Sequence, residues 1–197
     1  MEHKAWIQLR SGRAFYPADP DPALITIEDV AFALSNLCRF GGHVEFYSVA
    51  EHSVRVAALV AAQDTALTLA ALLHDASEGL GLVDVPKPVK VLLPDYDRLE
   101  AGVMRAVEVA FGLAPQACDH PLIKQADMMM LETERRLLHC APPQPWGTEH
   151  LNYVGQEELS VQTGVAPRLG VSSRAARWAF LDAAVRYGSR RALTSCA

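Results

Sequence analysis

The apolar residues of this chain recur every three or four positions over most of its length, and this spacing constrains the fold more than any other feature. Such a period places apolar side chains along one face of a helix, whereas a half-buried strand needs strict alternation. No alternating run is long enough to predict a sheet, although residues 6–9 have the pattern of one short strand. A chain of 197 residues suits one domain with a large core. We therefore predict an all-α fold, a single helical bundle over residues 1–197 with a short irregular N-terminal segment.

The first three expected helices begin at residues that cap helices well. Thr26 precedes an acidic residue at the third position, Ser48 opens a capping box, and Asp64 can cap a third helix. We expect this third helix to continue as far as the adjacent pair His74 and Asp75. A loop is expected from Gly79 to Pro88, where glycine and proline residues are frequent.

Three further helices and one long loop are expected in the second half of the chain. The helices run from Asp95 to Gly112, from residues 119–121 to about His139, and from Ser172 onward. Residues 141–170 have no sustained apolar period, so this segment is predicted to be a loop.

The charge of the chain argues against one large class of partner. Eighteen basic and 23 acidic residues give a formal net charge of −5, whereas a nucleic-acid-binding protein needs a broad basic face. The longest apolar run, residues 56–62, is far too short to cross a bilayer, and no signal peptide is expected because the first residues include charges and no apolar stretch. The four cysteines lack C-x-x-C spacing, so neither a zinc knuckle nor a disulfide framework is predicted. We expect a cytoplasmic protein with no nucleic-acid or membrane partner.

Four polar residues stand out because the sequence around them is apolar. His74 and Asp75 directly follow an apolar run, His52 lies one turn into a capped helix, and Asp127 interrupts an apolar helix face. Imidazole and ionised carboxylate groups on buried helices are costly unless they are paired or bound to a metal ion. Taken singly, His52 is more simply a helix-terminal histidine, and Asp127 the partner of Lys124 or of an arginine. Taken together, the order His…His-Asp…Asp on three or four helices favours a metal site.

Four short segments around these residues resemble the HD-domain metal-dependent phosphohydrolases. The segments are residues 48–53, 73–78, 84–90 and 124–127, in that order. They are most similar to the branch that contains bacterial 5′-deoxynucleotidases and phage deoxynucleotide hydrolases. Residues 11–20 are similar to a small-protein subgroup of the same branch. The resemblance covers about residues 5–140, with its motif core at about residues 26–140.

The resemblance implies a metal site and an activity. Its metal ligands would be His52, His74, Asp75 and Asp127, a mixed nitrogen and oxygen set that suits one divalent transition metal ion (Mn, Co, Zn, Ni or Fe). The implied enzyme is a metal-dependent phosphohydrolase, most simply a 5′-deoxynucleotidase that releases phosphate from deoxynucleoside 5′-monophosphates. The alternatives are a deoxynucleoside triphosphate triphosphohydrolase and a non-catalytic nucleotide-binding regulator. The implied partners are a small nucleotide substrate and further copies of the chain, in a dimer or a larger homo-oligomer.

Two acidic residues are the implied catalytic groups. Glu78 would orient the attacking water or move a proton, and it shares one side of the helix with Asp75 if that helix continues. Asp84 would face the reacting phosphate or the sugar. Gly79 follows Glu78, at a position where the alarmone hydrolases of the same superfamily have aspartate, and this difference argues against an alarmone substrate.

Four residues are the implied substrate-binding groups. Lys90 and Lys124 would contact phosphate oxygens as point charges. Arg39 and Phe40 occupy about the place of an Arg-Trp pair in the resembled 5′-deoxynucleotidases, which binds phosphate and stacks against the nucleoside. Phenylalanine in place of tryptophan keeps an aromatic face and loses the indole N–H donor.

Overall fold

Helices dominate the computed structural model of this protein, which describes residues 5–155 and 169–188. The helices are α1 (Ile27–Asn36), α2 (Val49–Ala61), α3 (Thr68–Leu72), α4 (Lys87–Lys90), α5 (Pro94–Ala110), α6 (Pro121–Leu138) and α8 (Ser173–Tyr187). Short 3-10 turns lie at Pro22–Leu24, Phe40–Gly42, Thr65–Leu67, Glu78–Leu80 and Ala117–Asp119. The sheet in the described residues is one antiparallel pair, β1 (Ile7–Gln8) with β2 (Ala14–Phe15). The prediction of a mostly helical fold is therefore confirmed.

The predicted helix starts agree with the structure because local capping determines them. The Thr26 hydroxyl accepts a hydrogen bond from the Asp29 N–H, and the Ser48 hydroxyl accepts one from the Glu51 N–H. The Asp64 carboxylate likewise caps the 3-10 turn that leads into α3. Of the predicted loop at residues 141–170, residues 156–168 lie outside the described residues.

The structure contains one half of the capping box predicted at Ser48, the hydrogen bond from the Glu51 N–H to the Ser48 hydroxyl. The Glu51 carboxylate accepts hydrogen bonds from Arg55 and from the backbone N–H groups of Gly170 and Val171. Glu51 is buried, so this contact joins α2 to the chain segment that leads into α8. The glutamate of the predicted capping box thus makes a tertiary contact with a segment far away in the sequence.

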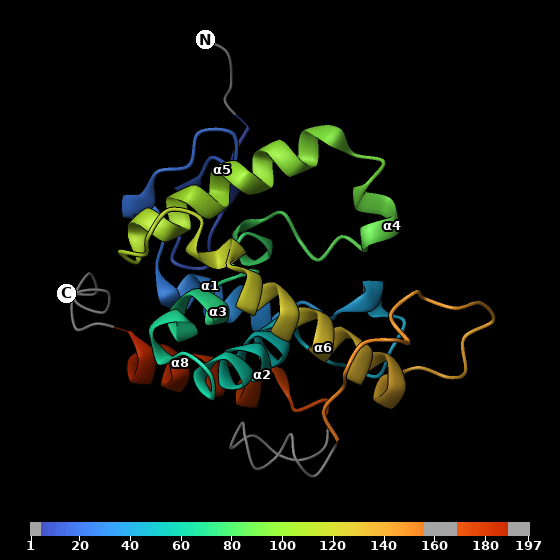
Figure 1. The fold of residues 1–197 in the computed structure, drawn as a ribbon. Coiled ribbons are helices and arrows are strands. Elements are labelled where there is room, and N and C mark those ends of the chain that lie inside the picture. The colour runs from blue at the N-terminus through green and yellow to red at the C-terminus, as the bar shows by residue number, and fades with distance from the viewer. Residues whose placement is uncertain (1–4, 156–168, 189–197) are drawn as a thin grey trace.

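Helix α2 lies at the centre of the fold. It packs against α1, α3, α6 and α8, and every residue from Val49 to Val60 is buried. Figure 1 shows α2 below α6, with α3 beside it and α8 along its lower side. A helix covered on all sides must bury whatever polar groups it carries, and this requirement applies to His52 and Glu51.

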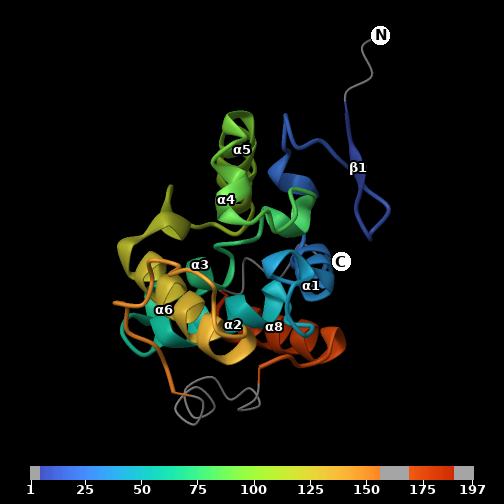
Figure 2. The same ribbon diagram turned by 90° about the vertical axis from the view of Figure 1, so that its right-hand side faces the viewer.

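Helices α4 and α5 lie apart from this central group. In Figure 2 they stand above α1, α2 and α8, and α5 packs against the 3-10 turn Pro22–Leu24. The prediction of a loop from Gly79 to Pro88 is partly wrong, because this segment begins within the 3-10 turn Glu78–Leu80 and ends within α4. Helix α5 begins at Pro94, one residue before the predicted Asp95. No helix in the described part of the chain has the length and apolar character to cross a membrane.

Helix α3 is shorter than predicted, and the difference matters for the site. It ends at Leu72, and residues 73–77 form turns that lead into the 3-10 turn Glu78–Leu80. His74 Nδ1 lies 2.7 Å from the carbonyl oxygen of Ala71, one of the carbonyl groups that the last turn of a helix leaves without a partner. The prediction that this helix continues to His74 and Asp75 is therefore wrong, and the condition for Glu78 to share a helix side with Asp75 is not met.

Candidate metal centre

Three of the four predicted metal ligands meet in the structure. His52 on α2 and the adjacent residues His74 and Asp75 each offer a ligand atom, and these atoms lie within 4.8 Å of one another. The turn after α3 allows this convergence, since adjacent residues on a helix point about 100° apart. His74 Nε2 is 3.3 Å from Asp75 Oδ2, and His52 Nε2 is 3.7 Å from the same oxygen.

The two histidines present free nitrogen atoms to this cluster. A carbonyl oxygen can only accept, so His74 Nδ1 carries a proton in its contact with Ala71, and Nε2 is the ring nitrogen that is left to bind a metal ion. Both Nε2 atoms are buried and have no partner in hydrogen-bond geometry, although that of His52 lies 3.1 Å from an oxygen of Asp127. Buried polar atoms are nearly always satisfied, so two such orphans facing one carboxylate fit a metal ion well. The donor set therefore fits a divalent transition metal.

Asp127 on α6 lies beside this group of three residues. Its Oδ1 is 3.1 Å from His52 Nε2, and its side chain is 37% exposed. Burial acts in the opposite direction, but the contact with His52 and the charges of His74 and Arg39 hold the pKa of Asp127 well below its usual range. Asp127 is thus an ionised carboxylate on the open side of the cluster.

His52 is surrounded by carboxylates. Burial and the charge of Arg39 lower the pKa of its imidazole, but Glu134 and Asp127 outweigh them and raise it to about 10. In the absence of a cation the surrounding carboxylates therefore favour the imidazolium form of His52, in which Nε2 carries the proton that a metal ion would replace. The surroundings attract positive charge, which a metal ion would also supply.

Two residues near His52, Glu134 and Tyr47, belong to no segment that we singled out in the sequence. Glu134 on α6 is fully buried, and its Oε1 lies 2.6 Å from His52 Nδ1 and 2.9 Å from the Tyr47 hydroxyl. Its Oε2 accepts a hydrogen bond from Arg39 Nε at 3.1 Å. Arg39 also lies 3.6 Å from Asp75, so the predicted phosphate-binding arginine borders the cluster.

Both predicted catalytic acids lie close enough to Asp75 for its charge to raise their pKa values. Glu78 is buried, and its Oε2 has no hydrogen-bond partner. Burial, with the nearby charges of Asp75 and Asp84, raises the pKa of Glu78 well above its usual value. Burial also raises the pKa of Asp84, helped by Asp75 and opposed by Arg39 and His52. Carboxyl groups that favour the protonated form suit proton transfer near neutral pH.

Strained backbone surrounds the contact between Phe40 and Asp84. The Phe40 N–H donates to Asp84 Oδ2 at 3.2 Å. Phe40 has a φ of 59° and Val83 a φ of 56°, in the left-handed region that bulky residues avoid. Such strain persists only where the surrounding structure compensates for it, and it is concentrated at functional sites.

The two predicted phosphate-binding lysines differ in position. Lys90 forms an ion pair with Glu100 at 2.8 Å, and the charges of Glu78 and Asp75 contribute to the raised pKa of its ammonium group. Lys124 is exposed and forms a 2.9 Å ion pair with Asp119. The structure therefore places Lys90 near the acidic residues of the site and directs Lys124 toward the surface.

Phe40 belongs to a group of three aromatic rings. It packs edge-on against His139 with ring centres 4.7 Å apart, and Trp146 lies 4.9 Å from His139 and 6.1 Å from Phe40. Trp146 is 40% exposed. The segment that carries it is held to α6 by Thr148, whose hydroxyl donates to Glu132 at 2.7 Å. Residues 139–148 thus contribute to the site surroundings, although we predicted most of them only as a loop.

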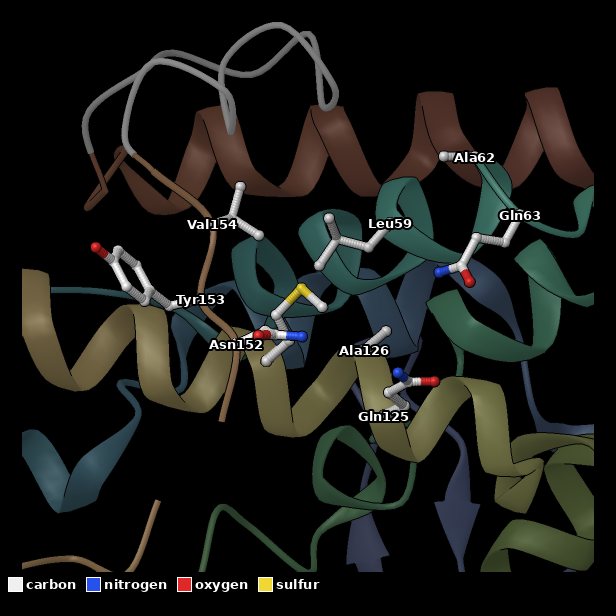
Figure 3. Close-up of a pocket in the computed structure, with 9 residues that line it drawn as sticks. Leu59, Ala62, Gln63, Gln125, Ala126, Asn152, Tyr153 and Val154 are labelled. Atoms are coloured by element: carbon white, nitrogen blue, oxygen red, sulfur yellow. The ribbon is translucent and has the colours of Figure 1, made fainter. Parts of the chain in front are cut away.

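A separate pocket lies between α2, α6 and residues 152–154, with a volume of about 320 Å³. Figure 3 shows the amide side chains of Gln63, Gln125 and Asn152 on its walls. None of the cluster residues lines it, so this pocket is not the candidate metal centre.

The fold and the cluster together define a mostly helical protein with a His/Asp group able to hold a metal ion, which is compatible with an HD-type domain. The chain matches no model of a known protein family. It is 42% identical over 133 residues to the uncharacterized protein YfdR of Escherichia coli K12, across 67% of this chain and 71% of that protein. An uncharacterized Rhodobacter capsulatus protein is 38% identical over 142 residues, which cover 66% of this chain and 71% of that protein. The chain therefore belongs to the family of YfdR.

Proposed function

We propose that this protein is a metal-dependent phosphohydrolase that acts on nucleotides, most simply as a 5′-deoxynucleotidase. One observation supports this proposal more than any other. The Nε2 atoms of His52 and His74, which lack hydrogen bonds, converge with Asp75 next to the buried carboxyl group of Glu78, whose Oε2 also has no hydrogen-bond partner. A ligand set beside a group that can exchange a proton is what the hydrolysis of a phosphate ester requires.

His52, His74 and Asp75 would hold the divalent ion, with Asp127 as the fourth ligand. When bound, such an ion supplies a more acidic water and a polarised phosphoryl group. The remaining chemistry belongs to side chains of the protein.

Glu78 would move the proton. Its Oε2 is buried without a partner, and its raised pKa favours the protonated form, which could donate a proton to the leaving oxygen of the substrate. Asp84, which is held by the Phe40 N–H, would orient the substrate beside it.

Arg39 and Lys90 would bind the phosphate. Arg39 is buried, and it is held by Glu134 on one side and faces Asp75 on the other. Its guanidinium group can meet a phosphate with two parallel N–H groups. Lys124 would reach the phosphate only after leaving Asp119.

Phe40, His139 and Trp146 support a nucleoside substrate. Aromatic faces stack on nucleobases with little dependence on the base, and this group lies next to Arg39, whose guanidinium carbon is 5.3 Å from the Phe40 ring centre. A ligand with phosphate on Arg39 and a planar ring near Phe40 would span both features.

The test is to incubate metal-loaded protein with nucleoside mono-, di- and triphosphates and to identify the phosphate released. Orthophosphate from monophosphates alone is the expected result. Tripolyphosphate would instead assign a triphosphohydrolase, and no turnover with any of Mn, Co, Zn, Ni or Fe would assign a non-catalytic regulator. His74→Ala should abolish the activity, whereas Asp182→Asn, which changes an exposed acidic residue of α8, should keep it. Equal activity in both variants would show that a contaminating phosphatase is responsible.

The expected homo-oligomer, dimer or larger, and the cytoplasmic location stay predictions. Size-exclusion chromatography with light scattering measures the first directly, and a single-chain mass in solution would contradict it.

A further inference from the structure

Glu134 connects two parts of the site that lie far apart in the sequence. Its carboxylate is fully buried. One oxygen faces both His52 Nδ1 at 2.6 Å and the Tyr47 hydroxyl at 2.9 Å, and the other accepts from Arg39 Nε at 3.1 Å. A single side chain of α6 thus contacts a candidate metal ligand and the candidate phosphate-binding arginine.

The three neighbours of Glu134 all act as donors. A guanidinium group has no acceptor, and the Tyr47 hydroxyl donates in its contact with the carboxylate. His52 Nδ1 must also carry a proton, because an ionised carboxylate only accepts. Only a group with two acceptor oxygens satisfies all three, and an amide in its place would turn an N–H toward one of these donors.

This arrangement determines what His52 presents to the cluster. With the proton on Nδ1, the lone pair lies on Nε2, and Nε2 faces Asp75 and Asp127 at 3.7 and 3.1 Å. The same carboxylate holds Arg39 with its terminal nitrogen 3.6 Å from Asp75. The tautomer of the ligand and the position of the arginine therefore depend on one buried group.

We propose that Glu134 is the positioning residue of the metal centre: it fixes the ring orientation and tautomer of His52 for metal binding, and it holds Arg39 beside Asp75. The proposal rests on the metal site of the proposed function. Carboxylates that support a metal-bound histidine in this way contribute about 10- to 100-fold to metal affinity.

A purely structural role for Glu134 makes a different prediction, and the chain offers a matched control. Glu132 lies two residues earlier on α6 and is equally buried. Its carboxylate accepts hydrogen bonds from Arg135, Arg136 and Thr148, and from none of the cluster residues. Glu132→Gln therefore disturbs a buried carboxylate on the same helix and leaves His52 untouched.

The experiment measures Zn²⁺ affinity of the full chain by competition with a chelator for wild type, Glu134→Gln and Glu132→Gln. We expect Glu134→Gln to weaken binding by about 10- to 100-fold and Glu132→Gln to change it by no more than about two-fold. Imidazole ¹⁵N chemical shifts of the Zn²⁺-loaded wild-type protein report the tautomer. They should show the proton on Nδ1 of His52 and the metal on Nε2.

Three results would overturn the proposal: Glu134→Gln with wild-type affinity, equal losses in both variants, or a His52 without a proton on Nδ1. The last measurement uses only wild-type protein, so the proposal can still be refuted if Glu134→Gln does not fold. None of these readouts is turnover. A wild-type protein that binds Zn²⁺ as expected but hydrolyses no nucleotide would refute the proposed function alone.

Discussion

Gly79→Ala adds one methyl group where the 3-10 turn Glu78–Leu80 packs against α1. The new Cβ would lie 3.0 and 3.1 Å from two side-chain carbons of Leu34 and 3.2 Å from the carbonyl oxygen of Val30. Leu34 is fully buried and the Val30 atom belongs to the backbone, so neither has solvent to move into. Both contacts are closer than ordinary van der Waals contact, and the helix and the turn must separate slightly.

The expected cost follows from two opposing effects. Overpacking a well-filled core costs about 1–3 kcal/mol, and alanine recovers about 0.4–1 kcal/mol because it has less freedom than glycine in the unfolded chain. We therefore expect Gly79→Ala to reduce the free energy of unfolding by about 1–2 kcal/mol. In a chain of this length each kcal/mol lowers Tm by about 2–4 °C.

Urea and thermal unfolding followed by circular dichroism measure this effect, and Gly102→Ala is the matched control. Gly102 lies inside α5, where the nearest atom to an added Cβ is an Arg105 guanidinium nitrogen at 3.8 Å. Alanine is favoured over glycine in a helix interior by about 0.8–1 kcal/mol, so this variant should gain stability. A Gly79→Ala protein as stable as wild type would refute the packing argument. A double-mutant cycle with Leu34→Ala should also show coupling between the two positions.

Four further predictions follow from the site and its surroundings. His74→Ala and Asp127→Ala should each lose bound metal, as measured by mass spectrometry of the elements after dialysis; unchanged metal content would contradict the ligand assignment. Glu78→Gln should retain the metal and lose about 10²- to 10⁴-fold in kcat, and full activity would remove its proposed role in proton transfer. Trp146→Ala should raise KM for nucleotides and leave KM for p-nitrophenyl phosphate unchanged, so a parallel rise for both substrates would argue against base stacking. Hydrogen bonds from arginines, against the opposing effect of burial, lower the pKa of Glu132 from 4.5 to about 2, so its stabilising contribution is complete above pH 4.5 and is lost as pH falls toward 2. Acid unfolding curves should therefore be shallower in Glu132→Gln than in wild type, and identical curves would show that this carboxylate contributes nothing.

Much of the helical fold could be read from short stretches of sequence. The starts of α1 and α2 follow from Thr26 and Ser48. Their hydroxyl groups accept hydrogen bonds from backbone N–H groups only three residues further along the chain. The burial of α2 follows in part from the apolar residues that make up most of its sequence. These features depend on neighbours along the chain, so a linear pattern contains the information.

The end of α3 was harder to predict for an energetic reason. The apolar run continues to Leu73, and nothing in the sequence requires the helix to stop at Leu72. In the structure the His74 ring contacts the Ala71 carbonyl and turns toward His52. Ending the helix at Leu72 is therefore favoured by contacts within the cluster. These contacts involve His52 of α2, which is distant from His74 in the sequence.

The candidate metal ligands could be selected from the sequence because polar residues in apolar surroundings must be explained by a partner. Their supporting residues could not. Glu134 follows His52 by 82 residues and Tyr47 by 87 residues, and beside the neighbouring acidic and basic residues of α6 it resembles an ordinary surface glutamate. Only the packing of α6 against α2 buries it and turns its carboxylate toward His52. Capping and periodicity act between residues a few positions apart, whereas the surroundings of a buried charge depend on which helices meet, and therefore on the whole tertiary structure.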